Sequence, residues 1–342
     1  MALTNANFQL LNILTFQPFM SIEEFLAEWH SDEPTMLVHT SGSTGKPKPM
    51  WAEKHRMEAS ACMTLDFLGL KAGDTALLCL PLDYIAGKMM VVRSLVGKLR
   101  LISVEPTGHP LADSSLGEGQ EQGIDFAAMV PLQVYNSLSE KKERERLSAI
   151  RHLIIGGGAI DERIENELRD FPNAVWSTYG MTETLSHIAL RRLNGKDASA
   201  WYTPMPDVKV SVDDNQCLTI DAPLLHEGVL HTNDIAEMSD DGRFRIHGRR
   251  DNVVCSGGLK IQIEDVERLL APHLHDAFLI TKRKDERLGE AMLLLTEGRD
   301  LDTVKNICRQ VLPRHWQPRS FQSVDKIPMT ETGKPFRKLC LL

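Results

Sequence analysis

The chain has 342 residues, of which 42% are hydrophobic and 25% are charged, so it can bury a large core and does not have the composition of a disordered protein. Its net charge is -8 at pH 7 and its Lys and Arg residues are scattered, which argues against nucleic acid as a partner. The six cysteines stand far apart without a C-x-x-C pair, which indicates reduced thiols rather than a zinc or redox motif.

The N-terminal residues do not have the layout of a signal peptide. Residues 1–20 are fairly apolar but contain no basic residue and are interrupted by Asn, Gln and Pro. No apolar run in the sequence approaches the roughly 20 residues that would span a bilayer. We therefore expect a cytoplasmic protein without a membrane partner.

The first part of the chain alternates short β-rich runs with amphipathic stretches, a pattern typical of α/β folds. Apolar residues at helical spacing predict surface helices over 138–149 and 160–171. The predicted strands are 35–40, 76–80, 99–104, 152–155 and 174–178.

The pattern changes from about Val208 to short strands with Asp- and Asn-containing turns at 213–215 and 240–242, which favour hairpins. We expect a small β-rich unit there. After Gly257 and Gly258 the pattern is mixed α+β. The predicted architecture is a large layered α/β N-terminal domain over 1–250 and a small, mobile α+β C-terminal domain over 251–342.

The segment 40–48, TSGSTGKPK, directly follows the first predicted strand. Its hydroxyls, glycines and lysines can surround a polyphosphate with N–H, O–H and ammonium donors. It is not a Walker A loop, because two residues separate its glycines and Pro47 follows Lys46. A flexible, solvated turn is the alternative. The candidate phosphate ligands are Thr40, Ser41, Gly42, Ser43, Thr44, Gly45 and Lys46.

A second motif, Tyr179-Gly-Met-Thr-Glu-Thr184, also follows a predicted strand. Tyr179 offers a flat face for a purine, Thr182 a hydroxyl for a phosphate, and Glu183 an oxygen ligand for magnesium. Taken alone, Thr182 and Glu183 are equally consistent with the start of a helix, where a carboxylate complements the dipole.

Two further segments carry candidate polar groups. Asp234 can accept hydrogen bonds from ribose hydroxyls, and Arg249 can add a charge-assisted donor. The nearby Asp240 and Asp241 are interpreted as a hairpin turn. Lys334, between Gly333 and Pro335, can reach a developing carboxylate-phosphate charge, although a lysine near a chain end is ordinarily a solvated surface residue.

Together these motifs resemble, in the same order, those of the adenylate-forming superfamily of acyl-CoA synthetases, adenylation domains and luciferases. The resemblance extends from Thr40 to Lys338. It implies that ATP activates a carboxylic acid to an acyl-adenylate with release of pyrophosphate, and that the acyl group then forms a thioester with coenzyme A. Magnesium is the implied metal. The chain is most similar to the short bacterial o-succinylbenzoate-CoA ligases of menaquinone synthesis.

The resemblance also implies roles for individual residues. The segment 40–48 is the phosphate loop, Lys334 serves adenylation, and the small C-terminal domain rotates between the two half-reactions. The other implied roles are adenine contacts by Gly157, Gly158, Ala159, Tyr179 and Gly180, α-phosphate contact by Thr182, magnesium binding by Glu183, ribose contacts by Asp234 and Arg249, a hinge at Asp251, and a thiol tunnel bordered by Gly257 and Gly258.

The chain departs from the family pattern at three places. The usual Thr-Gly-Asp is Thr232-Asn233-Asp234, Tyr84 stands where many members carry a His that lines the acyl pocket, and the phosphate loop begins unusually early, at residue 40. The short N-terminal region leads us to expect a homodimer.

The acyl pocket is the least determined part of the expected site. Lys88 and Arg93 lie in the stretch that lines this pocket by resemblance, although Arg93 is also consistent with a surface helix. A carrier-protein thiol in place of coenzyme A, or a non-catalytic nucleotide-binding module, remain alternatives.

Overall fold

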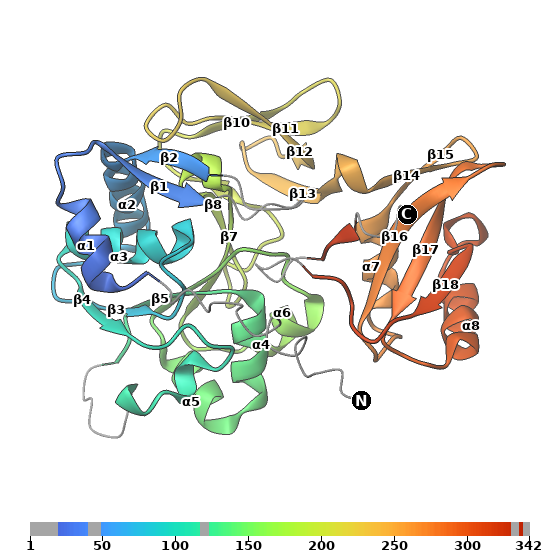
Figure 1. Cartoon of the computed structure of the whole chain (residues 1–342), viewed down its shortest axis with the longest axis horizontal. Helices are drawn as coiled ribbons and strands as arrows, with labels where there is room; N and C mark the ends of the chain where they lie inside the picture. The colour runs from blue at the N-terminus through green and yellow to red at the C-terminus, as the bar shows by residue number, and fades with distance from the viewer. Residues whose placement is uncertain (1–19, 40–48, 117–122, 330–334, 338–342) are drawn as a thin grey trace, which may run out of the picture.

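The computed structural model of the chain describes residues 20–39, 49–116, 123–329 and 335–337. A seven-stranded sheet in the order β4-β3-β5-β6-β7-β8-β9 lies at the centre of its first part (Figure 1). The strands from β4 to β7 run parallel, and β8 and β9 are antiparallel. The strands are β3 (Thr75–Leu78), β4 (Arg100–Ser103), β5 (Phe126–Met129), β6 (His152–Ile155), β7 (Ala174–Gly180), β8 (His187–Arg192) and β9 (Thr203–Pro204).

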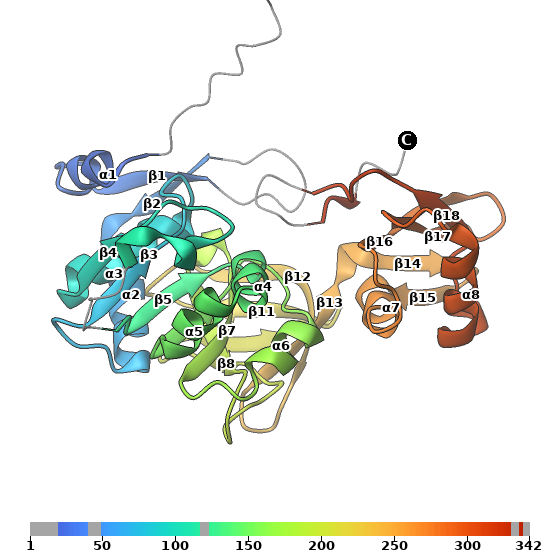
Figure 2. The same ribbon diagram turned by 90° about the horizontal axis from the view of Figure 1, so that it is seen from below.

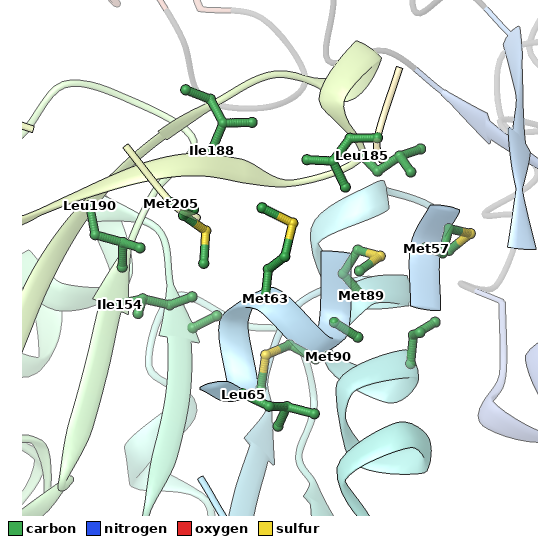
Figure 3. Close-up of a cluster of buried hydrophobic side chains, with 14 of the residues drawn as sticks. Met57, Met63, Leu65, Met89, Met90, Ile154, Leu185, Ile188, Leu190 and Met205 are labelled. Atoms are coloured by element: carbon green, nitrogen blue, oxygen red, sulfur yellow. The ribbon is translucent and has the colours of Figure 1, made fainter. Parts of the chain in front are cut away.

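Helices cover both faces of this sheet, and alternate residues of its strands point to opposite layers. Ala76 belongs to the buried cluster beneath α2 and α3, whereas Leu77 belongs to the cluster beneath α4, α5 and α6. Figure 3 shows the first cluster, which is rich in methionine and includes Met63, Met89 and Ile188. The helices are α2 (Lys54–Leu68), α3 (Ile85–Gly97), α4 (Pro131–Ser139), α5 (Lys141–Ala149) and α6 (Glu162–Leu168).

A short helix, α1 (Ile22–Trp29), and a two-stranded antiparallel sheet precede these layers. The strands are β1 (Thr35–His39) and β2 (Pro49–Glu53), and His39 pairs with Pro49. His39 also forms a bridge with Tyr84. His39 and Pro49, which flank the segment 40–48, therefore lie side by side, next to the start of α3.

The β-rich unit expected after Val208 is a four-stranded antiparallel sheet in sequence order, and its two predicted turns join neighbouring strands. Its strands are β10 (Lys209–Val212), β11 (Cys217–Asp221), β12 (Val229–Met238) and β13 (Phe244–Arg249). The described chain also contains short 3-10 helices at Pro110–Ala112, Ser114–Leu116, Thr182–Thr184, Arg250–Asn252 and Arg314–Trp316.

The residues after β13 form a sheet of their own with two helices, at one end of the molecule in both views (Figures 1 and 2). They enclose a separate buried cluster that includes Val254, Leu270 and Leu294. The elements are β14 (Val253–Ser256), β15 (Leu259–Gln262), α7 (Ile263–Leu270), β16 (Phe278–Asp285), β17 (Gly289–Thr296), α8 (Leu301–Val311) and β18 (Ser320–Ser323). The α/β architecture is confirmed, while the boundary at 250/251 and the mobility of the last part stay predictions.

The helix predicted over 138–149 is wrong at its start. Glu140 has an extended backbone, with φ -110° and ψ 120°, so that α4 ends at Ser139 and α5 begins at Lys141. The helix predicted over 160–171 is shorter and begins after Asp161, whose side chain accepts a hydrogen bond from the Arg163 N–H. No helix within the described ranges is long and apolar enough to cross a membrane.

We predict that the methionine-rich layer contributes strongly to stability. Met89→Ala leaves a cavity in a fully buried site, and should lower the free energy of unfolding by about 2–5 kcal/mol in chemical denaturation. Met329→Ala is the matched control because this side chain is 53% exposed, and its effect should be within about 0.5 kcal/mol. Equal effects of the two substitutions would contradict the layer assignment.

Candidate active site

The carboxyl ends of the parallel strands carry the glycine-rich segment 156–159. Gly157 is the second residue after the end of β6 and has a φ of 84°, in the left-handed region that favours glycine. The Gly156 N–H bonds the Met129 carbonyl at the end of β5, at 3.1 Å. Gly157, Gly158 and Ala159 are all exposed at this edge, where ligands bind in open α/β sheets.

Tyr179 and Asp234 meet although they belong to different sheets. The Tyr179 hydroxyl, at the end of β7, donates a 2.6 Å hydrogen bond to Asp234 Oδ2 on β12. Burial raises the pKa of Tyr179, and the negative charge of Asp234 raises it further, so the phenol stays protonated as a donor. The Tyr179 ring packs edge-on against Phe244, with centroids 5.2 Å apart.

Arg249 joins this pair from the last residue of β13. Its guanidinium donates to Asp234 Oδ1 at 3.2 Å and to Asp251 Oδ2 at 3.0 Å. Asp251 is exposed and lies in the 3-10 turn between β13 and β14. The Arg249 guanidinium therefore links Asp234, the other predicted ribose ligand, to Asp251, the predicted hinge residue.

The segment after Tyr179 forms a tight turn. Thr182 and Glu183 do not start an α-helix as one interpretation expected, because Leu185 adopts a left-handed φ of 63° and β8 begins two residues later. Thr184 Oγ1 donates to the Ser186 carbonyl at 2.8 Å and accepts from the Met181 N–H at 3.1 Å. Thr182 is buried and Glu183 is exposed.

Glu183 is suited to hold a metal only together with a bound ligand. Within the ranges that the structure describes, no three His, Cys, Asp or Glu side chains form a metal-binding group. Magnesium is commonly held by one or two carboxylates, substrate phosphates and water. A single exposed carboxylate beside the Thr182 hydroxyl fits that mode of binding.

Arg93 has the most unusual environment among the predicted site residues that carry a charge. It is 2% exposed, so the interpretation as a surface helix residue is wrong. Its Nη2 donates to Ser186 Oγ, its Nη1 lies 3.9 Å from Met90 Sδ, and its Nε bonds no described residue. Burial lowers the pKa of Arg93 to about 9, so it remains charged at neutral pH, and no carboxylate of the described residues pairs with it.

Lys88, on the same helix, has a different environment. Its Nζ lies 5.5 Å from the Phe25 ring centroid and 3.1 Å from Met20 Sδ. Burial lowers the pKa of Lys88, against the nearby charges of Glu28 and Asp83. Residues five apart on an α-helix lie about 140° apart around its axis, so Lys88 and Arg93 point to different sides of α3. Tyr84 is the residue before the first turn of α3.

The remaining predicted site residues fall in two places. Thr40 to Lys46 and Lys334 lie outside the described residues. Met329 and Pro335, which flank 330–334, form a bridge with each other. Gly257 and Gly258 form the turn between β14 and β15, beside a cavity of about 170 Å³ that is also lined by Leu288 and Arg319.

Three polar residues near Arg93 were not predicted. Ser186 and His187 directly follow the Tyr179–Thr184 motif, so their position in the sequence was a usable signal. Thr64 lies on α2 and contacts His187 across 123 residues of sequence, at 3.1 Å. A contact of that separation leaves no local pattern.

Comparison with known proteins gives concordant similarities. A family model described as AMP-binding enzyme matches residues 11–223. The 2-succinylbenzoate–CoA ligase of Bacillus licheniformis is 25% identical, over 90% of this chain and 70% of its own. The solved structure of an acyl-CoA synthetase (AMP-forming)/AMP-acid ligase II-like protein from Dyadobacter fermentans is 31% identical with a TM-score of 0.62, covering 92% of this chain and 91% of that one.

A further similarity concerns the fold alone. The o-succinylbenzoate CoA synthetase of Bacillus subtilis, solved with its acyl-adenylate intermediate, has a TM-score of 0.74 at 21% identity, over 90% of this chain and 69% of that one.

We predict that Gly180 cannot be replaced without moving the turn. A Cβ atom there would lie 2.2 Å from the Ser186 carbonyl oxygen, so Gly180→Ala should lower the free energy of unfolding by about 1–3 kcal/mol in chemical denaturation. Gly123→Ala is the control, since no atom of the described residues lies within 4 Å of its added Cβ. Unchanged stability of Gly180→Ala would show that the turn is looser than described.

Proposed function

The chain belongs to the AMP-binding enzyme family, and from this membership we propose that it is an acid–thiol ligase. It would use ATP to convert a carboxylic acid into an acyl-adenylate, release pyrophosphate, and transfer the acyl group to coenzyme A. The activities of the Bacillus licheniformis and Dyadobacter fermentans relatives support this proposal. The acid that we propose is o-succinylbenzoate, the acid named for the first relative.

The meeting of Tyr179, Asp234 and Arg249 carries the proposal. These side chains come from strands of two sheets and touch where the parallel strands end. In our proposal the adenine lies against Tyr179 and the ribose hydroxyls donate to the Asp234 carboxylate. The exposed backbone at Gly157 and Gly158 would allow the nucleotide to approach without a Cβ in its way.

In the adenylation step the acid's carboxylate attacks the α-phosphorus of ATP, and pyrophosphate leaves with the electron pair of the broken P–O bond. The Thr182 hydroxyl would donate to an α-phosphate oxygen. Magnesium, when bound at Glu183, supplies positive charge to the phosphates. The Lys334 ammonium would stabilise the charge that develops between carboxylate and phosphate.

Arg93 supports an acid that carries a second carboxylate. A buried cation without a counter-ion is strongly destabilising, and the described residues supply no carboxylate to Arg93. A dicarboxylic substrate would bring the missing charge into the apolar layer beneath α3. Arg93 is therefore preferred over Lys88, which already contacts Phe25.

In the thioester step the part of the chain after Asp251 would turn, and the Gly257–Gly258 turn would border the arm of coenzyme A. The Arg249 hydrogen bonds to Asp234 and Asp251 would couple this proposed hinge to groups bound at Asp234. A carrier-protein thiol is the rival acceptor. Cytoplasmic location and a homodimer also stay predictions.

The proposal is tested by pyrophosphate release over a panel of aromatic dicarboxylic, aromatic monocarboxylic and fatty acids, with and without coenzyme A. We expect release with o-succinylbenzoate and formation of its thioester when coenzyme A is present. Transfer only to a phosphopantetheinylated carrier protein would favour the rival acceptor. No release with any acid would favour a non-catalytic nucleotide-binding module.

Lys334→Ala should separate the two half-reactions. Loss of the ammonium should slow adenylation by about 10²–10³-fold, because a preorganised donor to the developing charge is removed. Thioester formation from supplied acyl-adenylate and coenzyme A should keep its rate. Equal losses in both half-reactions would contradict the role given to Lys334.

Arg93→Met should weaken acid binding without weakening the fold. Loss of charge-assisted hydrogen bonds to the second carboxylate should raise the KM for o-succinylbenzoate by about 10- to 100-fold. Removal of a buried charge that no described carboxylate pairs should leave the melting temperature equal or higher. Arg309→Met, at an exposed position on α8, is the control. An unchanged KM in Arg93→Met would remove Arg93 from the acid site.

A further inference from the structure

A row of hydrogen bonds leads from Arg93 into the apolar layer under α2. Arg93 Nη2 donates to Ser186 Oγ, and Ser186 Oγ lies 3.3 Å from His187 Nδ1. On the other side of the ring, His187 Nε2 lies 3.1 Å from Thr64 Oγ1. Thr64 Oγ1 in turn lies 3.1 Å from the Ser60 carbonyl oxygen. The row thus connects α3, the start of β8 and α2.

The two ends of the row fix the direction of every proton in it. A guanidinium only donates and a backbone carbonyl only accepts. Ser186 Oγ therefore accepts from Arg93 and has its own proton for His187 Nδ1. Thr64 gives its proton to the Ser60 carbonyl and must accept from His187. The ring is then neutral, with the proton on Nε2 and none on Nδ1.

The other neutral tautomer satisfies fewer groups. With the proton on Nδ1, Ser186 Oγ would accept from both Arg93 and His187, and its hydroxyl proton would have no acceptor among the described residues. Thr64 would then have to donate to His187 and could not also donate to Ser60. A doubly protonated ring would also leave the Ser186 hydroxyl proton without an acceptor among the described residues. It would add a second buried positive charge beside Arg93.

The surroundings of His187 favour the neutral ring. His187 is 6% exposed and Thr64 is fully buried. Burial, reinforced by the charge of Arg93, holds the pKa of His187 well below its usual value. Leu185 and Ile188, which flank Ser186 and His187 in sequence, lie in the methionine-rich cluster (Figure 3). The backbone on either side of Ser186 and His187 is thus fixed by buried apolar side chains.

We propose that His187, as its neutral Nε2-protonated tautomer, is a positioning residue that orients Ser186 and thereby holds the Arg93 guanidinium in place for the second carboxylate of the acid. The part of this inference that concerns the acid rests on the proposed function. His187 does not touch the substrate in this account. It sets which N–H groups of Arg93 are occupied by Ser186 and which remain for the ligand.

A merely structural role would predict a different outcome. If His187 only filled space, its replacement would lower stability and affect all substrates alike. In our account the effect is confined to the acid, because Tyr179, Asp234 and Arg249 hold the nucleotide through other elements. A side chain with one acceptor and one donor should also restore the row.

The test compares His187→Gln with His187→Leu in the full chain, with His275→Leu at an exposed position as control. Gln offers an acceptor to Ser186 and a donor to Thr64, and Leu offers neither. We expect His187→Leu to raise the KM for o-succinylbenzoate by about tenfold or more while the KM for ATP changes by less than about twofold. His187→Gln should restore most of the loss. Equal KM values for the acid in the Gln and Leu variants would overturn the proposal.

Two further measurements keep the inference testable. Nitrogen NMR of the labelled wild-type chain should show His187 Nδ1 without a proton, and a protonated Nδ1 would refute the row whatever the substrate. If His187→Leu does not fold, Thr64→Val removes the acceptor at the far end and should raise the KM for the acid in the same direction. No pyrophosphate release by the wild type with any dicarboxylic acid would overturn the proposed function together with the acid part of this inference.

Discussion

The hydrogen bond between Tyr179 and Asp234 is the contact on which the rest of the account depends. It joins the end of β7 in the seven-stranded sheet to β12 in the four-stranded sheet, at 2.6 Å. Arg249 pairs with the same carboxylate and with Asp251. The Tyr179–Asp234 contact is therefore connected to the turn between β13 and β14, which leads into the C-terminal sheet. One carboxylate thus fixes the relative position of a ring suited to adenine, a site suited to ribose and a turn suited to a hinge.

A second constraint is the buried charge of Arg93, with which no carboxylate of the described residues pairs. The residue is buried beside an apolar cluster rich in methionine and leucine, where apolar packing would be more stable than a cation. Its hydrogen-bond partner within the described chain is the neutral hydroxyl of Ser186. The hydrogen bonds that continue through His187 and Thr64 involve only neutral groups and supply no negative charge. In the part of the chain that the structure describes, the proposed acid site thus lacks an anion, in contrast to the proposed nucleotide site, where Arg249 pairs with Asp234 and Asp251.

The sequence predicted the parts of the fold that have local patterns. Runs of β-branched and apolar residues located β6 and β7, and Asp- and Gly-containing turns located the four-stranded sheet. Helices α2 and α3 were not predicted, because buried polar residues such as Thr64, Lys88 and Arg93 leave neither helix with a simple apolar stripe. Arg93 was open to a surface interpretation because its partner Ser186 is 93 residues away. Thr182 and Glu183 resembled a helix start because the left-handed Leu185 that ends the turn is not predictable from its side chain.

The central claim is that the Tyr179–Asp234 contact marks an adenosine nucleotide site. Calorimetric binding of ATP to the wild type and to Asp234→Ala tests it most directly, with Asp240→Ala, at the exposed turn between β12 and β13, as the matched control. Loss of the hydrogen bonds to the charged carboxylate should raise the Kd for ATP by about tenfold or more in Asp234→Ala, and Asp240→Ala should bind like the wild type. Equal Kd values for ATP in the wild type and Asp234→Ala would contradict the account.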